Sequence, residues 1–209
     1  MRRTLILLSP IAVILVGTTV IRLAQVSLGV WAWLPWILVY WGLIFVLVII
    51  GAGTSAIKRW MGPPNGSWLW SALALLLALP ALTLFVTSSH LLKPLQVWVP
   101  WLVVALVNPF LEEWYWRGLL LDTAKPWPSW LAIGTTSLLF SLNHLLGIGV
   151  TSLGGRHPML LINTFVLGVI FAVIYKKTNS LRWLIVSHVV TDLLGLSVPV
   201  FLNLWVPPT

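Results

Sequence analysis

Acidic side chains are rare in this chain of 209 residues, and their positions are unusual. Only four Asp or Glu residues occur, and Glu112, Glu113 and Asp192 lie inside or at the edge of long apolar segments. An ionisable side chain at the centre of a membrane helix costs about 2.5–3.5 kcal/mol, so such residues normally face a bundle interior and mark a functional site. The candidate site residues in apolar segments are Glu112, Glu113, Arg117, His144, His188 and Asp192. Carboxylates and imidazoles of this kind can transfer protons or bind a metal ion.

Two adjacent glutamates are expected to have different roles. Glu113 and Arg117 are four residues apart, which places them on one helical face with the acid on the N-terminal side, the better order for an ion pair. Glu112 is turned about 100° from Glu113 at 3.6 residues per turn, so the two carboxylates should not point equally well at one spot. We therefore expect Arg117 to hold Glu113 as a packing pair, which leaves Glu112 free for chemistry.

Two further pairs have the same spacing. Phe140 lies one helical turn before His144, and His188 lies one turn before Asp192. A lone histidine in a membrane helix more often hydrogen-bonds to a neighbouring helix and stabilises the packing than acts as a catalyst. Two histidines, a glutamate and an aspartate on three separate segments of a chain this poor in polar groups favour one convergent site.

The composition indicates where this site must lie. Hydrophobic residues make up 59% of the chain and charged residues only 8%, and the mean hydropathy is +1.01. Soluble domains carry about 25% charged residues, so the soluble enzyme folds are excluded. The net charge of +8 comes from basic residues at the ends of apolar segments, which argues against nucleic acid as a partner. The absence of cysteine excludes disulfides, thiolate metal sites and a cysteine nucleophile.

The hydropathy pattern predicts an all-α fold, a polytopic transmembrane bundle of seven to eight helices. Loop residues divide the chain into seven apolar segments. We place them at 4–26, 35–57, 68–91, 96–121, 129–148, 157–175 and 181–206. The last segment contains Asp192, Gly195 and Pro199, and we expect it to be broken into two shorter helices. No joint can hold a separate domain, so residues 1–209 form one integral membrane domain.

The basic residues predict the orientation in the membrane. With seven passes, eight of them fall on one side: Arg2, Arg3, Lys58, Arg59, Lys125, Lys176, Lys177 and Arg182. Arg22, Lys93 and Arg156 fall on the other. The positive-inside rule then places the N-terminus in the cytoplasm. Seven passes leave the C-terminus outside, and an eighth short helix would reverse the side of the C-terminus. We expect the protein in a plasma (inner) membrane. Most of the tryptophans lie near predicted helix ends and are expected to anchor there among lipid headgroups: Trp31, Trp33, Trp60, Trp68, Trp98, Trp101, Trp127, Trp130, Trp183 and Trp205.

The ordered motifs resemble the CAAX protease and bacteriocin-processing enzyme (CPBP or ABI) family of glutamic-type intramembrane proteases. The matching elements are Glu112-Glu113-xxx-Arg117, Phe140-xxx-His144, the weaker Phe165-Val166-Leu167-Gly168, and His188-xxx-Asp192. The resemblance covers about residues 96–200. It implies an endopeptidase that cleaves a membrane-associated protein or peptide, and we expect cleavage near the cytoplasmic half of the bilayer.

The same resemblance implies roles for individual residues. Glu112 and His144 would activate water, and His188 with Asp192 would stabilise the oxyanion. Many family members have asparagine at the last position; an ionised Asp192 would repel an oxyanion, so it is protonated, orients His188, or accompanies a cation. The resemblance requires no cofactor, but zinc is possible, and Glu112, His144, His188 and Asp192 would then be its ligands.

Two other classes of function stay open. The same Glu, His and Asp residues could form a proton or ion relay in a transporter. The fold could also serve as a non-catalytic membrane scaffold. A transporter should show repeat symmetry between its halves, which this sequence lacks, and a scaffold should have lost a motif residue, whereas none is lost. The protease is therefore favoured.

Overall fold

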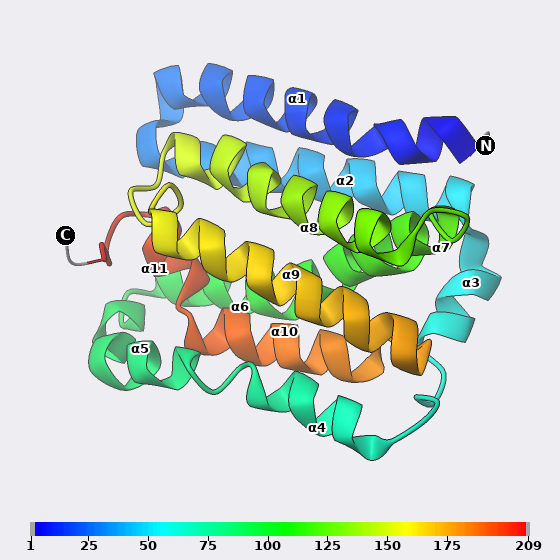
Figure 1. The fold of residues 1–209 in the computed structure, drawn as a ribbon. Coiled ribbons are helices and arrows are strands. Elements are labelled where there is room, and N and C mark those ends of the chain that lie inside the picture. Colours follow the sequence, from blue (N-terminus) through cyan, green and yellow to red (C-terminus); the bar gives the residue numbers. More distant parts are fainter. Residues whose placement is uncertain (1–2, 208–209) are drawn as a thin grey trace.

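The computed structural model describes residues 3–207, and within them the regular structure is entirely helical (Figure 1). Arg2, which contributed to the predicted orientation, lies outside the described residues. The helices are α1 (Arg3–Leu28), α2 (Trp33–Gly51), α3 (Gly53–Trp60), α4 (Trp68–Leu76), α5 (Ala81–Ser88), α6 (Leu95–Glu112), a π-helix (Glu113–Leu119), α7 (Leu120–Thr123), α8 (Ser129–Leu146), α9 (Pro158–Thr178), α10 (Arg182–Leu194) and α11 (Ser197–Phe201). Short 3-10 turns cover Gly29–Ala32, Ser89–Leu92 and Ile148–Val150. The predicted all-α bundle is confirmed.

The helices have the length and composition of a membrane protein. Within the described range, five helical stretches are long and apolar enough to cross a bilayer: Arg3–Gly51, Trp68–Leu92, Leu95–Thr123, Ser129–Val150 and Pro158–Thr178. The first stretch contains both α1 and α2, which run antiparallel (Figure 1). Large apolar side chains such as Leu23, Val26 and Val86 stay exposed, as expected for surfaces that contact lipid.

The shorter helices arise where the backbone departs from regular geometry. Residues 77–80 form turns between α4 and α5, and Pro80 lacks the N–H that would continue the helix. The final segment breaks between α10 and α11, as predicted, with Leu196 at a φ of 51°. α10 has only 13 residues and lies inside the bundle, packed against α6, α4 and α5.

The two ends of the bundle differ in charge. One end gathers the start of α1, α3, α7, the end of α9 and the start of α10 (Figure 1). We call it the basic end, because it carries Arg3, Lys58, Arg59, Lys125, Lys176, Lys177 and Arg182. The opposite end gathers the Gly29–Ala32 turn, α5, the 147–157 loop and α11, and it carries only Arg22, Lys93 and Arg156.

Asp122, the fourth acidic residue, ties the basic end together. Its carboxylate accepts hydrogen bonds from Tyr175 Oη at 2.8 Å and from Trp60 Nε1 at 3.1 Å. Arg59 and Lys125 pair with it at 3.1 Å each. One carboxylate therefore links α3, α7 and α9.

The tryptophans only partly follow the prediction of interfacial anchoring. Trp68 and Trp130, at helix starts, are 73% and 75% exposed, as an anchor should be. Trp33 and Trp60 are each 1% exposed, so the prediction is wrong for them, as it is for Trp101, which is 8% exposed. Trp60 packs onto Gly118, where an added Cβ would lie 2.8 Å from the indole, so the close contact between α3 and the π-helix needs a glycine. Neighbouring helices cover the rings of Trp33 and Trp60, which a pattern read along one segment does not show.

Candidate active site

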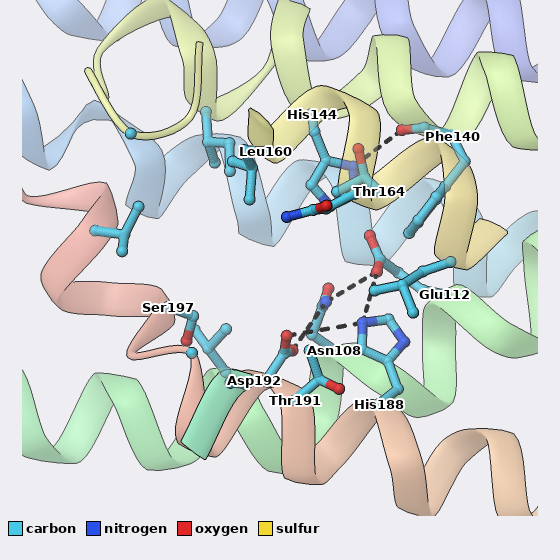
Figure 2. A pocket seen from close by; sticks show the side chains of 18 of the residues that line it. Asn108, Glu112, Phe140, His144, Leu160, Thr164, His188, Thr191, Asp192 and Ser197 are labelled. Carbon is cyan, nitrogen blue, oxygen red and sulfur yellow. Dashed lines mark hydrogen bonds and ion pairs between the residues drawn. The ribbon is translucent and has the colours of Figure 1, made fainter. Parts of the chain in front are cut away.

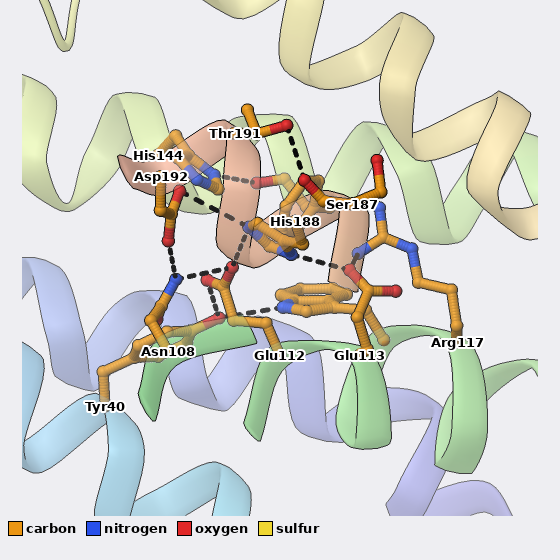
Figure 3. A network of polar contacts seen from close by, with 12 residues as sticks. Tyr40, Asn108, Glu112, Glu113, Arg117, His144, Ser187, His188, Thr191 and Asp192 are labelled. Carbon is orange, nitrogen blue, oxygen red and sulfur yellow. Dashed lines mark hydrogen bonds and ion pairs between the residues drawn. The ribbon is translucent and has the colours of Figure 1, made fainter. Parts of the chain in front are cut away.

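The predicted site residues converge on one cavity of about 600 Å³. α6 supplies Glu112, α8 supplies His144, and α10 supplies His188 and Asp192 (Figure 2). The π-helix supplies Glu113 and Arg117 (Figure 3). The helix that carries the two glutamates was expected to keep 3.6 residues per turn, but the chain from Glu113 to Leu119 is wound as a π-helix. π-helical turns are rare and occur frequently at functional sites.

Glu113 is the centre of a buried charge cluster. Its Oε1 accepts a hydrogen bond from Arg117 at 3.1 Å, and the two side chains are 0% and 3% exposed, so the predicted pair is present and buried. The Arg117 guanidinium also lies 4.2 Å from the centre of the Phe140 ring and 5.7 Å from that of Phe171. A cation over an aromatic face is stabilised by the ring quadrupole, which adds to the ion pair.

The same oxygen of Glu113 also holds His188. His188 Nδ1 lies 2.9 Å from Glu113 Oε1. An ionised carboxylate only accepts hydrogen bonds, so Nδ1 carries a proton and donates it. The ring is thereby fixed with Nε2 directed to the other side, 3.6 Å from Glu112 Oε2 (Figure 3). The two glutamates thus contact opposite nitrogens of one imidazole, an arrangement that their separation of one residue did not predict.

Glu112 does not pair with Arg117, but it is held by neutral donors. Its Oε1 accepts a hydrogen bond from Tyr40 Oη at 2.7 Å, and its Oε2 accepts one from Asn108 Nδ2 at 3.0 Å (Figure 3). Trp116 Nε1 donates to Tyr40 Oη at 2.9 Å, so the phenol proton is directed at the carboxylate. Two neutral polar partners therefore set the orientation of the Glu112 carboxylate.

Asp192 lies close to His188 without a hydrogen bond between them. Asp192 Oδ1 is 3.7 Å from His188 Nε2, and Asp192 Oδ2 is 3.5 Å from Asn108 Nδ2. The predicted spacing of one helical turn brings both groups to the cavity, and the aspartate lies within electrostatic reach of the ring. The hydrogen bond that fixes the ring therefore comes from Glu113, and Asp192 lies near Nε2 without one.

His144 presents one nitrogen to the cavity. Its Nδ1 lies 2.9 Å from the carbonyl oxygen of Phe140, one turn earlier in α8. A carbonyl can only accept, so Nδ1 carries the proton and Nε2 of the neutral ring is an acceptor. The ring packs edge-on against Phe140 with centroids 4.6 Å apart, as their spacing predicted. Nε2 of His144 can therefore take a proton from a molecule in the cavity.

Sequence reasoning missed two residues that hold Glu112. Asn108 lies four residues before Glu112 on the same face of α6, and a polar amide in an apolar helix was a visible signal. Trp41 Nε1 donates to Asn108 Oδ1 at 2.9 Å and so fixes which side of the amide faces Glu112. Tyr40 gave no signal, because it lies on α2, 72 residues away along the chain.

The candidate zinc ligands are Glu112, His144, His188 and Asp192, all of which line the cavity. Zinc sites in enzymes use three protein ligands and a water. Within residues 3–207, no group of three His, Asp or Glu side chains is arranged to hold a metal ion. His188 can offer only Nε2, because Nδ1 faces Glu113.

The sequence comparisons bear on one half of the chain. A family model described as Type II CAAX prenyl endopeptidase Rce1-like matches residues 93–194. This range contains Glu112, His144, His188 and Asp192, whereas Tyr40 lies outside it. Searches of curated proteins and of solved structures find no match.

Proposed function

We propose that this chain, which belongs to the CAAX protease family, is an intramembrane endopeptidase that hydrolyses a peptide bond in a membrane-associated protein or peptide. The observation that carries the proposal is the position of Glu112 and His144. They come from different helices and line one cavity inside an apolar bundle (Figure 2). The carboxylate of Glu112 and Nε2 of His144 are both held in a fixed orientation and can each accept a proton from a water molecule, which is the requirement for a general base.

Water activation is assigned to this pair. A water between them loses a proton to the Glu112 carboxylate or to His144 Nε2, and its oxygen attacks the carbonyl carbon of the scissile peptide. Tyr40 and Asn108 hold the carboxylate in place, so little reorganisation is needed when the proton moves. When the tetrahedral intermediate collapses, the C–N bond breaks and the same proton passes to the leaving amine.

The oxyanion is assigned to His188. Its ring lies among three carboxylates, since Glu113 contacts Nδ1 while Glu112 and Asp192 lie 3.6 and 3.7 Å from Nε2. This surrounding negative charge favours a ring protonated on both nitrogens, and its Nε2–H can donate to the oxygen that develops charge. In this scheme Asp192 supports the charge of His188, in place of the amide that many family members have there.

We place the protein in the plasma membrane with its N-terminus in the cytoplasm. The supporting observation is the concentration of basic residues at one end of the bundle, where the positive-inside rule expects the cytoplasm.

The function is tested by cleavage of a panel of membrane-anchored peptides by purified protein in detergent. We expect Glu112→Gln and His144→Ala to abolish cleavage, because each removes a proton acceptor. His90→Ala is the matched control, since this histidine is exposed and does not line the cavity. Zinc is measured in the same samples, and stoichiometric zinc that cleavage requires would replace the metal-free scheme. Cleavage that survives either substitution at Glu112 or His144 refutes the assignment.

A further inference from the structure

We propose that the active-site cavity opens to the membrane face opposite the basic end, and that its substrate is an apolar peptide segment held in the leaflet on that face. The inference rests on the proposed peptidase function and adds the side and the chemistry of the substrate. It adds the side of entry to the expectation that the peptide is cut near the cytoplasmic half of the bilayer, which stays a prediction.

Packed side chains close the cavity at the basic end. Trp60, Trp116, Leu120, Ile174 and Leu181 are among the buried residues there, each 2% exposed or less. The backbone N–H of Leu181 donates to the carbonyl of Trp60 at 2.8 Å, which joins the start of α10 to the end of α3. Beyond this layer, Asp122 links α3, α7 and α9. A peptide arriving at the basic end would have to unpack this layer to reach Glu112.

The far end of the cavity is lined by the connecting segments at the opposite end of the bundle. Gly154 and His157 of the 147–157 loop and Trp205 and Pro207 after α11 all line it. Three hydrogen bonds hold this rim together: Ser152 Oγ donates to the carbonyl of Val200 at 2.7 Å, Leu153 N–H donates to Asn203 Oδ1 at 2.6 Å, and Asn203 Nδ2 donates to the carbonyl of Thr151 at 2.9 Å. These hydrogen bonds join the 147–157 loop to the segment around α11. We call this rim the collar; it lies at the end of the bundle opposite the basic end.

The distance from the collar to the catalytic groups suits an extended chain. Glu112 is 17 residues from the start of α6 at that end, which is about 25 Å at 1.5 Å per residue. An extended peptide covers this distance with roughly eight residues at about 3.3 Å each. The scissile bond therefore lies deep, below a stretch of substrate that the cavity must bind.

The cavity is also open at its side. Met159 and Val166 of α9 line it and are nevertheless 60% and 44% exposed. Ala81 and Leu84 of α5 line the facing wall. α5 is separated from α4 by the turns at residues 77–80, so this wall is a short helix. A segment embedded in the adjoining leaflet can therefore pass between α5 and α9.

The walls select an apolar segment. Leu77, Leu84, Leu160, Leu167 and Ile170 line the cavity between the collar and the catalytic groups. Its charged lining residues are Glu112, Glu113, Arg117 and Asp192, which interact with one another or with His188, so a charged substrate side chain would find no dedicated partner within the described residues.

The positive-inside rule assigns the basic end to the cytoplasm, so the collar and the side opening lie on the outer face.

The absence of natural cysteines makes the test direct. Single cysteines replace His157 at the collar, Leu153 in the adjacent exposed loop and Lys125 at the basic end. Intact cells are treated with a bulky membrane-impermeant maleimide. We expect His157→Cys and Leu153→Cys to be labelled in intact cells, and Lys125→Cys only after permeabilisation. Labelling of Lys125→Cys in intact cells, with the other two protected, overturns the proposal.

Cleavage measurements then test whether the collar is the route of access. The unmodified variants are first shown to cut an apolar membrane-anchored peptide, which confirms that they fold. We expect modified His157→Cys to lose at least about tenfold in cleavage rate, and modified Lys125→Cys to keep its rate. Unchanged cleavage by modified His157→Cys refutes access through the collar. Peptide cleavage that fails in every variant and in the natural chain refutes the peptidase function itself, and the labelling pattern still reports the orientation.

Discussion

The hydroxyl of Tyr40 should be essential for full activity, although this residue lies outside the region that matches the family. Tyr40→Phe removes one oxygen atom and keeps the ring, which stacks on Trp36 with centroids 5.4 Å apart. Two hydrogen bonds are lost, the 2.7 Å bond to Glu112 Oε1 and the 2.9 Å bond from Trp116 Nε1. Both partners are buried, so neither regains a bond from bulk solvent.

The two lost bonds have different consequences. A hydrogen bond to a charged group contributes about 1.5–3 kcal/mol. If that amount is used to hold the Glu112 carboxylate in its reactive position, kcat falls about 10- to 150-fold. The unpaired Trp116 N–H costs about 1–3 kcal/mol of stability, so the unfolding midpoint in detergent should fall as well. Because Tyr40 contacts Glu112, the proposed general base, and not the substrate, KM should change little.

Tyr115→Phe provides a matched control. Tyr115 is also a fully buried phenol, and its hydroxyl is 2.7 Å from Ser9 Oγ, away from the catalytic carboxylate. We expect this variant to lose stability and to keep kcat. Steady-state cleavage and thermal unfolding of both variants separate the two effects. A Tyr40→Phe enzyme with unchanged kcat, or an equal loss of kcat in Tyr115→Phe, would refute a positioning role for the Tyr40 hydroxyl.

The other contacts predict three further outcomes. Glu113→Gln leaves the Arg117 charge buried without a counter-ion, so thermal unfolding should show a loss of about 3–5 kcal/mol; an unchanged midpoint would mean that the pair is not needed for folding. Asp192→Asn should keep cleavage within about tenfold of the natural enzyme, because an amide can itself donate to the oxyanion, and a complete loss of kcat would contradict this position for the oxyanion. Asp122→Asn weakens the ion pairs with the exposed side chains of Arg59 and Lys125, so the free energy of unfolding should fall by about 1 kcal/mol with kcat unchanged. A large fall in kcat would show that the basic end takes part in catalysis.

The parts of the site that follow helical periodicity could be predicted from the sequence. Glu113 with Arg117, and Phe140 with His144, are each one turn apart, and both pairs make the expected contacts. The apolar segments and the break in the last one were predictable because a bilayer demands long apolar helices and because glycine and proline interrupt them. Such patterns depend only on neighbours along one helix.

The interactions between helices could not be predicted in this way. The bond between Glu113 and His188 joins residues 75 positions apart, and it depends on how α10 enters the bundle. The π-helix from Glu113 to Leu119 has no counterpart in a 3.6-residue pattern. The burial of Trp60 likewise depends on its contact with Gly118. These features follow from packing, which one sequence does not specify by its periodicity.

The region that matches the family does not by itself contain the complete site. α2 supplies Tyr40 to the base, and α5, also outside residues 93–194, supplies a wall of the cavity. The acid groups and histidines that define the motifs therefore act inside a shell that the first three apolar segments help to build. In the proposed scheme the wall binds the segment and the motif residues cleave it, so changes in that shell can alter which peptide reaches Glu112 without touching a motif residue. Substrate preference should consequently follow residues such as Leu84 more closely than residues of the catalytic cluster, and swapping the α5 wall between relatives should transfer preference while leaving kcat on a common peptide unchanged.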